Sequence, residues 1–213
     1  MILSTLPKTW VFDLDGTLLD TIAMNMYPLI KIIKEELGIE KTFEEVKHCF
    51  SMTGKQTLDY WGIDYERVYP RWVQYVNEYE KGAVPFEDVV HILKLFKKAG
   101  IKQAACSAKT YAQYEIDMQI DNLKDYMDTV VLFEDTKKHK PDAEPLWLCV
   151  ERLGISQDKV LYVGDALADG LACQSAGIDF AWAKWAGIEV ENMPKAKYVL
   201  HSVKDLWELM QDE

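Results

Sequence analysis

Two pairs of carboxylates are the residues of this sequence best suited to chemistry. Asp13 and Asp15 belong to the run DLDGT, and because side chains alternate along an extended chain, both point to the same side. Asp165 and Asp169 follow the apolar run VLYV, and a spacing of four places them on one side of a helix that begins there. Neighbouring carboxylates repel each other unless a cation lies between them, and Mg²⁺ prefers oxygen ligands. Together the pairs predict a magnesium site, although a turn or a helix cap would explain either pair alone.

Two further residues are candidates for binding the oxygens of a phosphate group. Ser107 ends the apolar run KQAAC, so we expect its hydroxyl and the following backbone N–H groups at the start of a helix. Lys140 precedes Pro141, which fits the first turn of a helix that reaches Leu153. An ammonium group at that place would neutralise both a carboxylate and an incoming phosphate. Each signal is weak alone, since a solvated lysine or a serine at a strand end is common.

Short apolar runs alternate with helical periodicity along most of the chain. We expect strands at 9–14, 102–106, 129–133, 160–163 and 180–182. We expect helices at 87–99, 111–120, 143–153 and 167–176. Strands separated by helices imply right-handed crossovers. The predicted fold class is therefore α/β, a Rossmann-like parallel sheet flanked by helices.

The segment between residues 20 and 82 interrupts this alternation. Its apolar residues recur at steps of three or four before Gly38 and again before Gly82, and no strand is indicated. We expect a small all-helical domain at 20–82, inserted into a core domain formed by 1–19 and 83–213. Short junctions near Asp20 and at 83–85 would act as hinges.

Composition limits the class of protein and its partners. The chain has 213 residues, of which 49% are hydrophobic and 28% charged, as is usual for globular domains. The net charge is −11, which argues against nucleic acid as a partner, because binding of the phosphate backbone depends on clustered cations. No run of about 18 apolar residues and no signal peptide is apparent, so we expect a cytoplasmic protein without a membrane partner. The four widely spaced cysteines are expected to be buried, reduced thiols.

The sequence resembles the haloacid dehalogenase-like (HAD) superfamily of hydrolases, subfamily I, with a helical cap of the C1 type. The four motifs of that family appear in order, as Asp13-x-Asp15-Gly16-Thr17, Ser107, Lys140-Pro141 and Gly164-Asp165-x-x-x-Asp169. The resemblance covers nearly the whole chain, including the place of the helical insert. Within the superfamily, the chain is similar to phosphoglycolate phosphatases and to phosphatases of the β-phosphoglucomutase type.

The resemblance implies a role for each motif residue. Asp13 would be the nucleophile that forms an aspartyl phosphate, and Asp15 the acid/base that protonates the leaving alcohol and then activates water. Ser107 and Lys140 would hold the phosphoryl group. The implied Mg²⁺ ligands are Asp13, Asp15 through its carbonyl, Asp165 and Asp169, the last of which either assists the metal or pairs with Lys140.

The same resemblance implies substrate contacts from the loops that carry the motifs. The residues concerned are Gly16, Thr17, Ala108 and Lys109. Ala108 stands where the phosphoglycolate phosphatases usually have Asn, which removes a side-chain contact near the phosphate and leaves the substrate open. In the helical insert, Lys55 lies in a stretch, 53–56, that we expect to be a loop between two helices. It would bind a second anion such as a carboxylate, or it would be an ordinary solvated lysine.

The predicted function is a Mg²⁺-dependent phosphatase that hydrolyses a small phosphorylated metabolite, phosphoglycolate-like or a sugar phosphate. The protein would be a monomer or a homodimer. Asp15 favours a phosphatase or a phosphomutase over a dehalogenase, because a dehalogenase protonates no ester oxygen. Two alternatives remain: a phosphomutase of the β-phosphoglucomutase type, and a non-catalytic relative that binds a phosphorylated ligand. The presence of Asp13, Asp15 and Lys140 disfavours the second.

Overall fold

The computed structural model describes residues 9–211 and divides the chain into two compact units. One unit comprises Met1–Leu19 and Pro85–Glu213, and the other comprises Asp20–Val84. The chain crosses between them within two short paired strands, β2 (Leu19–Asp20) and β3 (Val84–Pro85). The sequence predicts boundaries after residues 19 and 82, and the two units divide after residues 19 and 84. The action of the segment 20–82 as a hinged cap stays a prediction.

The larger unit is built on a six-stranded sheet whose strand order is β5-β4-β1-β6-β7-β8. The strands are β1 (Thr9–Phe12), β4 (Lys102–Cys106), β5 (Thr129–Val131), β6 (Val160–Gly164), β7 (Asp179–Ala183) and β8 (Tyr198–Leu200). Every pairing between them is parallel. The central strands β1 and β6 are buried along their whole length, which explains their continuous apolar sequences. The predicted fold class is confirmed.

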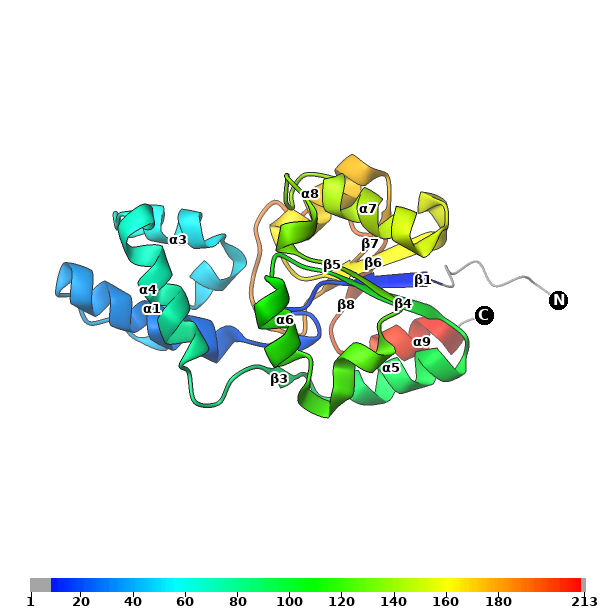
Figure 1. The fold of residues 1–213 in the computed structure, drawn as a ribbon, viewed down its shortest axis with the longest axis horizontal. Coiled ribbons are helices and arrows are strands. Elements are labelled where there is room, and N and C mark those ends of the chain that lie inside the picture. Colours follow the sequence, from blue (N-terminus) through cyan, green and yellow to red (C-terminus); the bar gives the residue numbers. More distant parts are fainter. Residues whose placement is uncertain (1–8, 212–213) are drawn as a thin grey trace. The chain divides into compact units, whose positions relative to one another are not determined.

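Helices cover both faces of this sheet (Figure 1). They are α5 (Val89–Lys98), α6 (Tyr111–Asp117), α7 (Glu144–Leu153), α8 (Leu167–Ala176) and α9 (Asp205–Gln211). Short 3₁₀ helices are η2 (Ile120–Tyr126), η3 (Phe133–Asp135) and η4 (Gln157–Lys159). Figure 1 shows α7 and α8 on one face and α5 and α9 on the other. Side-chain packing joins the layers, for example where Trp10 of β1 meets Phe96 of α5 with ring centroids 4.8 Å apart.

The helices α7 and α6 begin within one residue of the expected positions, but the residues ahead of them lie differently from the sequence-based expectation. Helix α7 begins at Glu144, whose N–H donates to Asp142 Oδ1 at 3.0 Å, so Pro141 lies before the helix and Pro145 occupies its first turn. Helix α6 begins at Tyr111, so Ser107 lies in a loop rather than at a helix N-terminus. The reason is a reciprocal cap in which Thr110 and Gln113 exchange hydrogen bonds.

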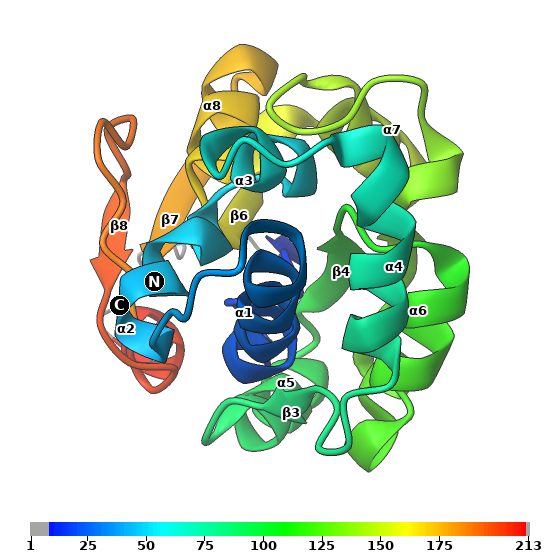
Figure 2. The ribbon, with the colours of Figure 1, turned by 90° about the vertical axis from the view of Figure 1, so that its left-hand side faces the viewer.

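The smaller unit contains helices alone, apart from the ends that form β2 and β3. They are α1 (Ile22–Leu37), α2 (Phe43–Val46), the 3₁₀ helix η1 (Lys47–Ser51), α3 (Gly54–Tyr60) and α4 (Tyr65–Asn77). Helices α1 and α4 pack together, and α3 packs on α4 (Figure 2). The stretch 53–56, expected to be a loop, is instead the capped first turn of α3. Thr53 N–H donates to Gln56 Oε1 at 2.9 Å, and Gln56 N–H donates back to Thr53 Oγ1 at 3.2 Å.

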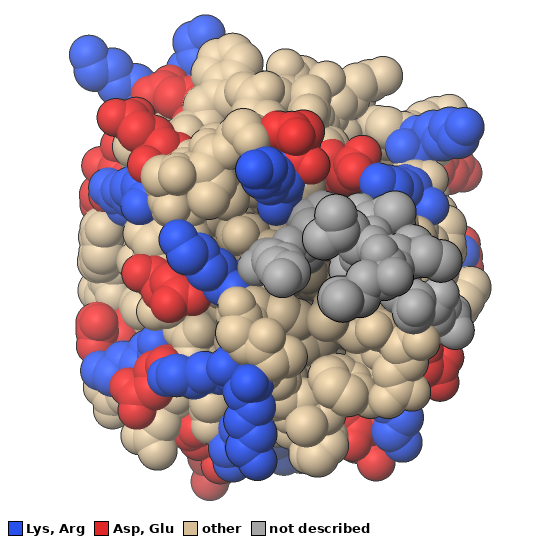
Figure 3. Space-filling model, turned by 90° about the vertical axis from the view of Figure 1, so that its right-hand side faces the viewer, with Lys and Arg blue, Asp and Glu red and all other residues tan. Residues whose placement is uncertain are grey.

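The surface carries mixed charges. On the face drawn in Figure 3, Lys and Arg side chains are interspersed with Asp and Glu side chains. Among residues 9–211, no helix combines the length and the apolar character that crossing a bilayer demands. All four cysteines are buried free thiols, as the sequence predicts.

Candidate active site

The predicted site residues of the larger unit follow three adjacent strands of the sheet. Strand β1 lies between β4 and β6, and Phe12 is in register with Ala105 on one side and Val163 on the other. Asp13 therefore leaves the sheet beside Cys106 and Gly164, and its N–H still donates to Val163 O at 2.9 Å. The carboxyl ends of parallel strands are where ligands bind in such sheets.

Three buried carboxylates meet at this edge. Asp13, Asp165 and Asp169 each offer an oxygen atom, and these oxygens lie within 4.8 Å of one another. Burial raises the pKa of Asp13 to about 6, with Lys140 acting in the opposite direction. Burial, together with the two neighbouring carboxylates, raises the pKa of Asp165 well above its ordinary value. Asp13 and Asp165 thus resist being ionised together unless positive charge lies nearby.

Lys140 supplies one positive charge to this cluster. Its Nζ lies 3.1 Å from Asp13 Oδ1 and 2.6 Å from Asp169 Oδ1, and its side chain is almost completely buried. Nζ also donates hydrogen bonds to the Tyr162 hydroxyl at 2.9 Å and to Cys106 O at 3.2 Å. Burial lowers the pKa of Lys140, but the Asp13 and Asp169 carboxylates outweigh it and the pKa is raised. Lys140 is therefore a fixed ammonium group.

Asp169 uses both of its carboxylate oxygens within the protein. Oδ1 lies against Lys140 and is also 3.0 Å from the Tyr162 hydroxyl, while Oδ2 accepts from Ala166 N–H at 3.0 Å. Of the two roles that the resemblance leaves open, this geometry favours pairing with Lys140.

Asp165 is fixed by the turn that carries the first motif. Its Oδ1 accepts a hydrogen bond from Thr17 Oγ1 at 3.0 Å. Gly16 has φ +77°, and a Cβ at that position would lie 2.2 Å from Asp165 Oδ2. The turn and the carboxylate therefore approach each other as closely as glycine permits.

Two tryptophan side chains donate hydrogen bonds to backbone carbonyl groups of the loops that carry Thr17 and Asp165. Trp185 Nε1 donates to Thr17 O at 2.9 Å, and Trp182 Nε1 donates to Asp165 O at 3.3 Å. Thr17 itself is fully buried, and its hydroxyl donates a hydrogen bond to Asp165.

Asp15 lies apart from the three buried carboxylates and pairs with a different lysine. Lys109 Nζ is 2.9 Å from Asp15 Oδ1 and 2.7 Å from Asp117 Oδ2. Burial lowers the pKa of Lys109, but the two carboxylates outweigh it, and the pKa is raised. The resemblance implies a substrate contact for Lys109, whereas its ammonium group is buried and engaged with two carboxylates.

The remaining predicted residues divide between the two units. Ser107 and Ala108 line one small pocket together with Lys140 and His139. Lys55 belongs to the smaller unit, where its exposed side chain pairs with Asp59 at 2.7 Å.

Mg²⁺ fits the donor set of Asp13 and Asp165. Asp13 Oδ1 is buried and accepts no hydrogen bond from residues 9–211, although Lys140 lies opposite it. Such an oxygen, next to a second buried carboxylate, suits a hard divalent cation.

Sequence reasoning missed Tyr162 and Asp117 as parts of the site. Tyr162 lies in the middle of the buried strand β6, where an aromatic residue is expected for packing alone. Asp117 is a buried acid at the end of α6, and a carboxylate in that setting needs a partner. The sequence does not indicate which lysine that partner is.

We expect Tyr162→Phe to lower the free energy of unfolding by about 1–2 kcal/mol, because the buried hydroxyl joins Lys140 and Asp169. Tyr111→Phe is the matched control, since the Tyr111 hydroxyl bonds Asp135 at the exposed surface and its loss should cost less than about 0.5 kcal/mol. Urea unfolding of the two variants measures the difference, and equal losses would contradict a special role for Tyr162.

Known proteins resemble this chain along almost its full length. The family model for haloacid dehalogenase-like hydrolases matches residues 10–183. A Caldanaerobacter subterraneus protein with the provisional name pyrophosphatase PpaX is 30% identical over 203 residues, 94% of this chain and 92% of its own. The phosphoglycolate phosphatase of Aquifex aeolicus is 29% identical over 208 residues, 95% of this chain and 96% of its own.

A solved structure supports the same relationship at the level of the fold. The crystal structure of a provisionally identified phosphoglycolate phosphatase from Lactobacillus plantarum matches with a TM-score of 0.87 at 18% identity, covering 96% of this chain and 99% of its own. The family model spans most of the chain and includes all four motifs. The predicted superfamily and enzyme class are thereby confirmed: the chain belongs to the haloacid dehalogenase-like hydrolases.

Proposed function

We propose that this hydrolase is a Mg²⁺-dependent phosphatase that cleaves a small phosphate monoester through an aspartyl phosphate on Asp13. The observation that carries the proposal is the position of the Asp13 carboxylate. It lies at the end of β1, 3.1 Å from the ammonium group of Lys140 and beside the buried Asp165. A carboxylate attacks a phosphate dianion only where positive charge offsets the repulsion between them.

The two carboxylates of the first motif divide the chemistry. In the first step, an Asp13 oxygen forms a bond to phosphorus, the bond to the leaving oxygen breaks, and Asp15 gives its proton to that oxygen. In the second step, water gives a proton to Asp15 and attacks phosphorus, which breaks the bond to Asp13 and releases inorganic phosphate. Asp15 ends the cycle as it began, so protons balance. Splitting the reaction in this way replaces one difficult step with two easier ones.

The other residues bind and position. Lys140 and Ser107 hold the oxygens of the transferring group, since both line one small pocket and the Lys140 ammonium group also lies 3.1 Å from Asp13 Oδ1. Asp169 and Tyr162 are positioning residues that fix the Lys140 ammonium group. Asp13, the Asp15 carbonyl and Asp165 would bind Mg²⁺. The ion would neutralise part of the negative charge that opposes phosphoryl transfer.

The substrate is a small phosphorylated metabolite in this proposal. The relative from A. aeolicus supports phosphoglycolate, and the relative from C. subterraneus supports inorganic pyrophosphate as a second candidate. Ala108, in the pocket beside Ser107, offers no polar side chain to the phosphate, so discrimination would fall on residues that contact the leaving group.

We expect Asp13→Asn to lower the turnover of p-nitrophenyl phosphate at least about a thousandfold, because the amide is no nucleophile. Asp179→Asn is the control, since Asp179 forms an exposed pair with Lys197. Chelation with EDTA should abolish the activity of the native protein, and Mg²⁺ should restore it. Full turnover in Asp13→Asn, with the variant folded by circular dichroism, would end the proposal.

A panel of phosphate donors should distinguish the candidate functions. We expect phosphate release from phosphoglycolate, sugar phosphates or pyrophosphate, with kcat/KM for the best substrate at least about tenfold above that for p-nitrophenyl phosphate. A phosphomutase would instead isomerise a hexose phosphate, with a bisphosphate primer, without net phosphate release. Binding without turnover of any donor would indicate the non-catalytic alternative.

We expect Gly16→Ala to weaken Mg²⁺ binding at least about tenfold, because its Cβ would displace the Asp165 carboxylate. Gly100→Ala is matched in backbone strain, with φ +73° against +77°, but its Cβ would meet no atom within 4 Å. Titration calorimetry of both variants with MgCl₂ separates the two effects. Equal affinities would show that Asp165 is not needed for the metal.

A further inference from the structure

We propose that Lys109 and Asp117 are positioning residues for Asp15, an inference that rests on the proposed function of Asp15 as acid and base. We call the three residues Asp15, Lys109 and Asp117 the Lys109 triad. They come from the turn after β1, the loop after β4 and the last turn of α6. The triad fixes one oxygen of Asp15 and leaves the other to exchange protons.

The contacts of the Lys109 triad are short and enclosed. The ammonium group lies 2.9 Å from Asp15 Oδ1 and 2.7 Å from Asp117 Oδ2, and the Lys109 and Asp117 side chains are each 8% exposed. Asp15 Oδ1 is itself buried, whereas the Asp15 side chain as a whole is 33% exposed. The exposed part of the carboxylate therefore lies on the side of Oδ2, away from Lys109.

Asp117 explains how a lysine can serve here. A buried ammonium group needs a buried counter-charge, because the desolvation of an unpaired charge is costly. Asp117 supplies that counter-charge, since its Oδ2 lies 2.7 Å from Lys109 Nζ. Lys109 is thereby held in place and orients Asp15 through the 2.9 Å contact with Oδ1.

A second cluster in the same unit has the same construction. We call Asp13, Lys140 and Asp169 the Lys140 triad, in which a buried lysine also lies between one carboxylate of the first motif and one from elsewhere. Each of the two functional carboxylates therefore has its own buried lysine and its own counter-carboxylate. Buried ion pairs are poor contributors to stability, so their repetition at these two positions points to control of geometry.

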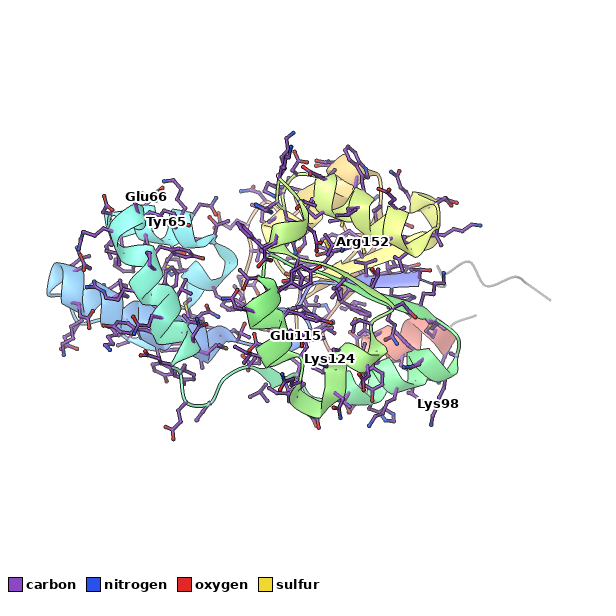
Figure 4. The ribbon with its side chains drawn as sticks, in the orientation of Figure 1. Tyr65, Glu66, Lys98, Glu115, Lys124 and Arg152 are labelled. Carbon is purple, nitrogen blue, oxygen red and sulfur yellow. The ribbon has the colours of Figure 1, made fainter. Side chains whose placement is uncertain are left out.

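An ordinary ion pair on the same helix provides the comparison. Glu115 of α6 pairs with Lys124 at 3.1 Å, but these side chains are 54% and 42% exposed. Figure 4 labels both residues, Glu115 on α6 and Lys124 on the segment that follows it. Glu115 lies two residues from Asp117 along the chain, so the pair starts from the same helix as the Lys109 triad and differs from it in burial.

The test compares Asp117→Asn, Lys109→Met and Lys109→Arg with the controls Glu115→Gln and Lys124→Met. Two substrates are used: p-nitrophenyl phosphate, whose leaving group departs without a proton, and the best alkyl phosphate from the panel, whose leaving group needs one. Because kcat/KM reports the steps up to alcohol release, a misplaced Asp15 should lower it at least about tenfold more for the alkyl phosphate.

A second readout comes from the water step. With p-nitrophenyl phosphate, the variants should release one nitrophenolate per enzyme in a fast burst and then turn over slowly, because Asp15 no longer activates water well. Lys109→Arg should recover part of both effects relative to Lys109→Met, and the controls should behave as the native protein. The ratio between substrates and the occurrence of a burst do not depend on the folded fraction, although the burst amplitude counts the folded enzyme. Should Lys109→Met fail to fold, Asp117→Asn decides.

Equal losses on both substrates without a burst would overturn the inference and leave only a structural role for the triad. The proposed function is tested separately, because it fails if Asp13→Asn is active. An inactive Asp13→Asn together with an unchanged substrate ratio in Asp117→Asn would overturn this inference alone.

Discussion

Repulsion among buried carboxylates is the constraint on which the rest of the site depends. Asp13, Asp165 and Asp169 lie together where water does not screen them, and Lys140 is the one ammonium group that contacts this cluster among residues 9–211. Replacing such a cluster with apolar side chains would often stabilise a fold. This chain keeps the charged cluster instead, and the excess negative charge favours binding of a divalent cation. In the proposed function, the bound cation then favours binding of the negatively charged substrate.

The parallel sheet supplies the rigidity that this cluster needs. Strands β4 and β6 lie on either side of β1, so the loops that follow them each begin one strand spacing from the loop that carries Asp13. Hydrogen bonds then tie the loops together, as Thr17 does to Asp165 and Trp185 does to Thr17. Groups that must act on one phosphorus atom are thereby placed by the most deeply buried part of the chain.

The sequence reveals those features whose cause is local. Apolar runs are enough to place β1, β4 and β6, and with them the loops that carry Asp13, Ser107 and Asp165, whereas β1 ends at Phe12 and Asp15 lies apart from Asp13. The expectation that Pro141 lies in the first turn of α7 was wrong, because the helix begins at Glu144, whose N–H donates to Asp142 Oδ1. The expectation of a loop at 53–56 was wrong because Thr53 and Gln56 form a helix cap. Strand β8 has three residues and α9 seven, too few for a periodicity to emerge.

Contacts between side chains of different helices, strands or loops cannot be predicted from local sequence patterns. A lysine after a strand and an aspartate at the end of a helix have ordinary surface explanations, and only the packing of α6 brings them together. In the proposed function, this packing divides the roles of the two carboxylates. Because the Lys140 triad and the Lys109 triad share no residue, the proposed nucleophile Asp13 and the proposed proton carrier Asp15 are oriented independently. A change in one triad can therefore alter proton transfer while the attack on phosphorus is preserved, which a single shared lysine would not allow.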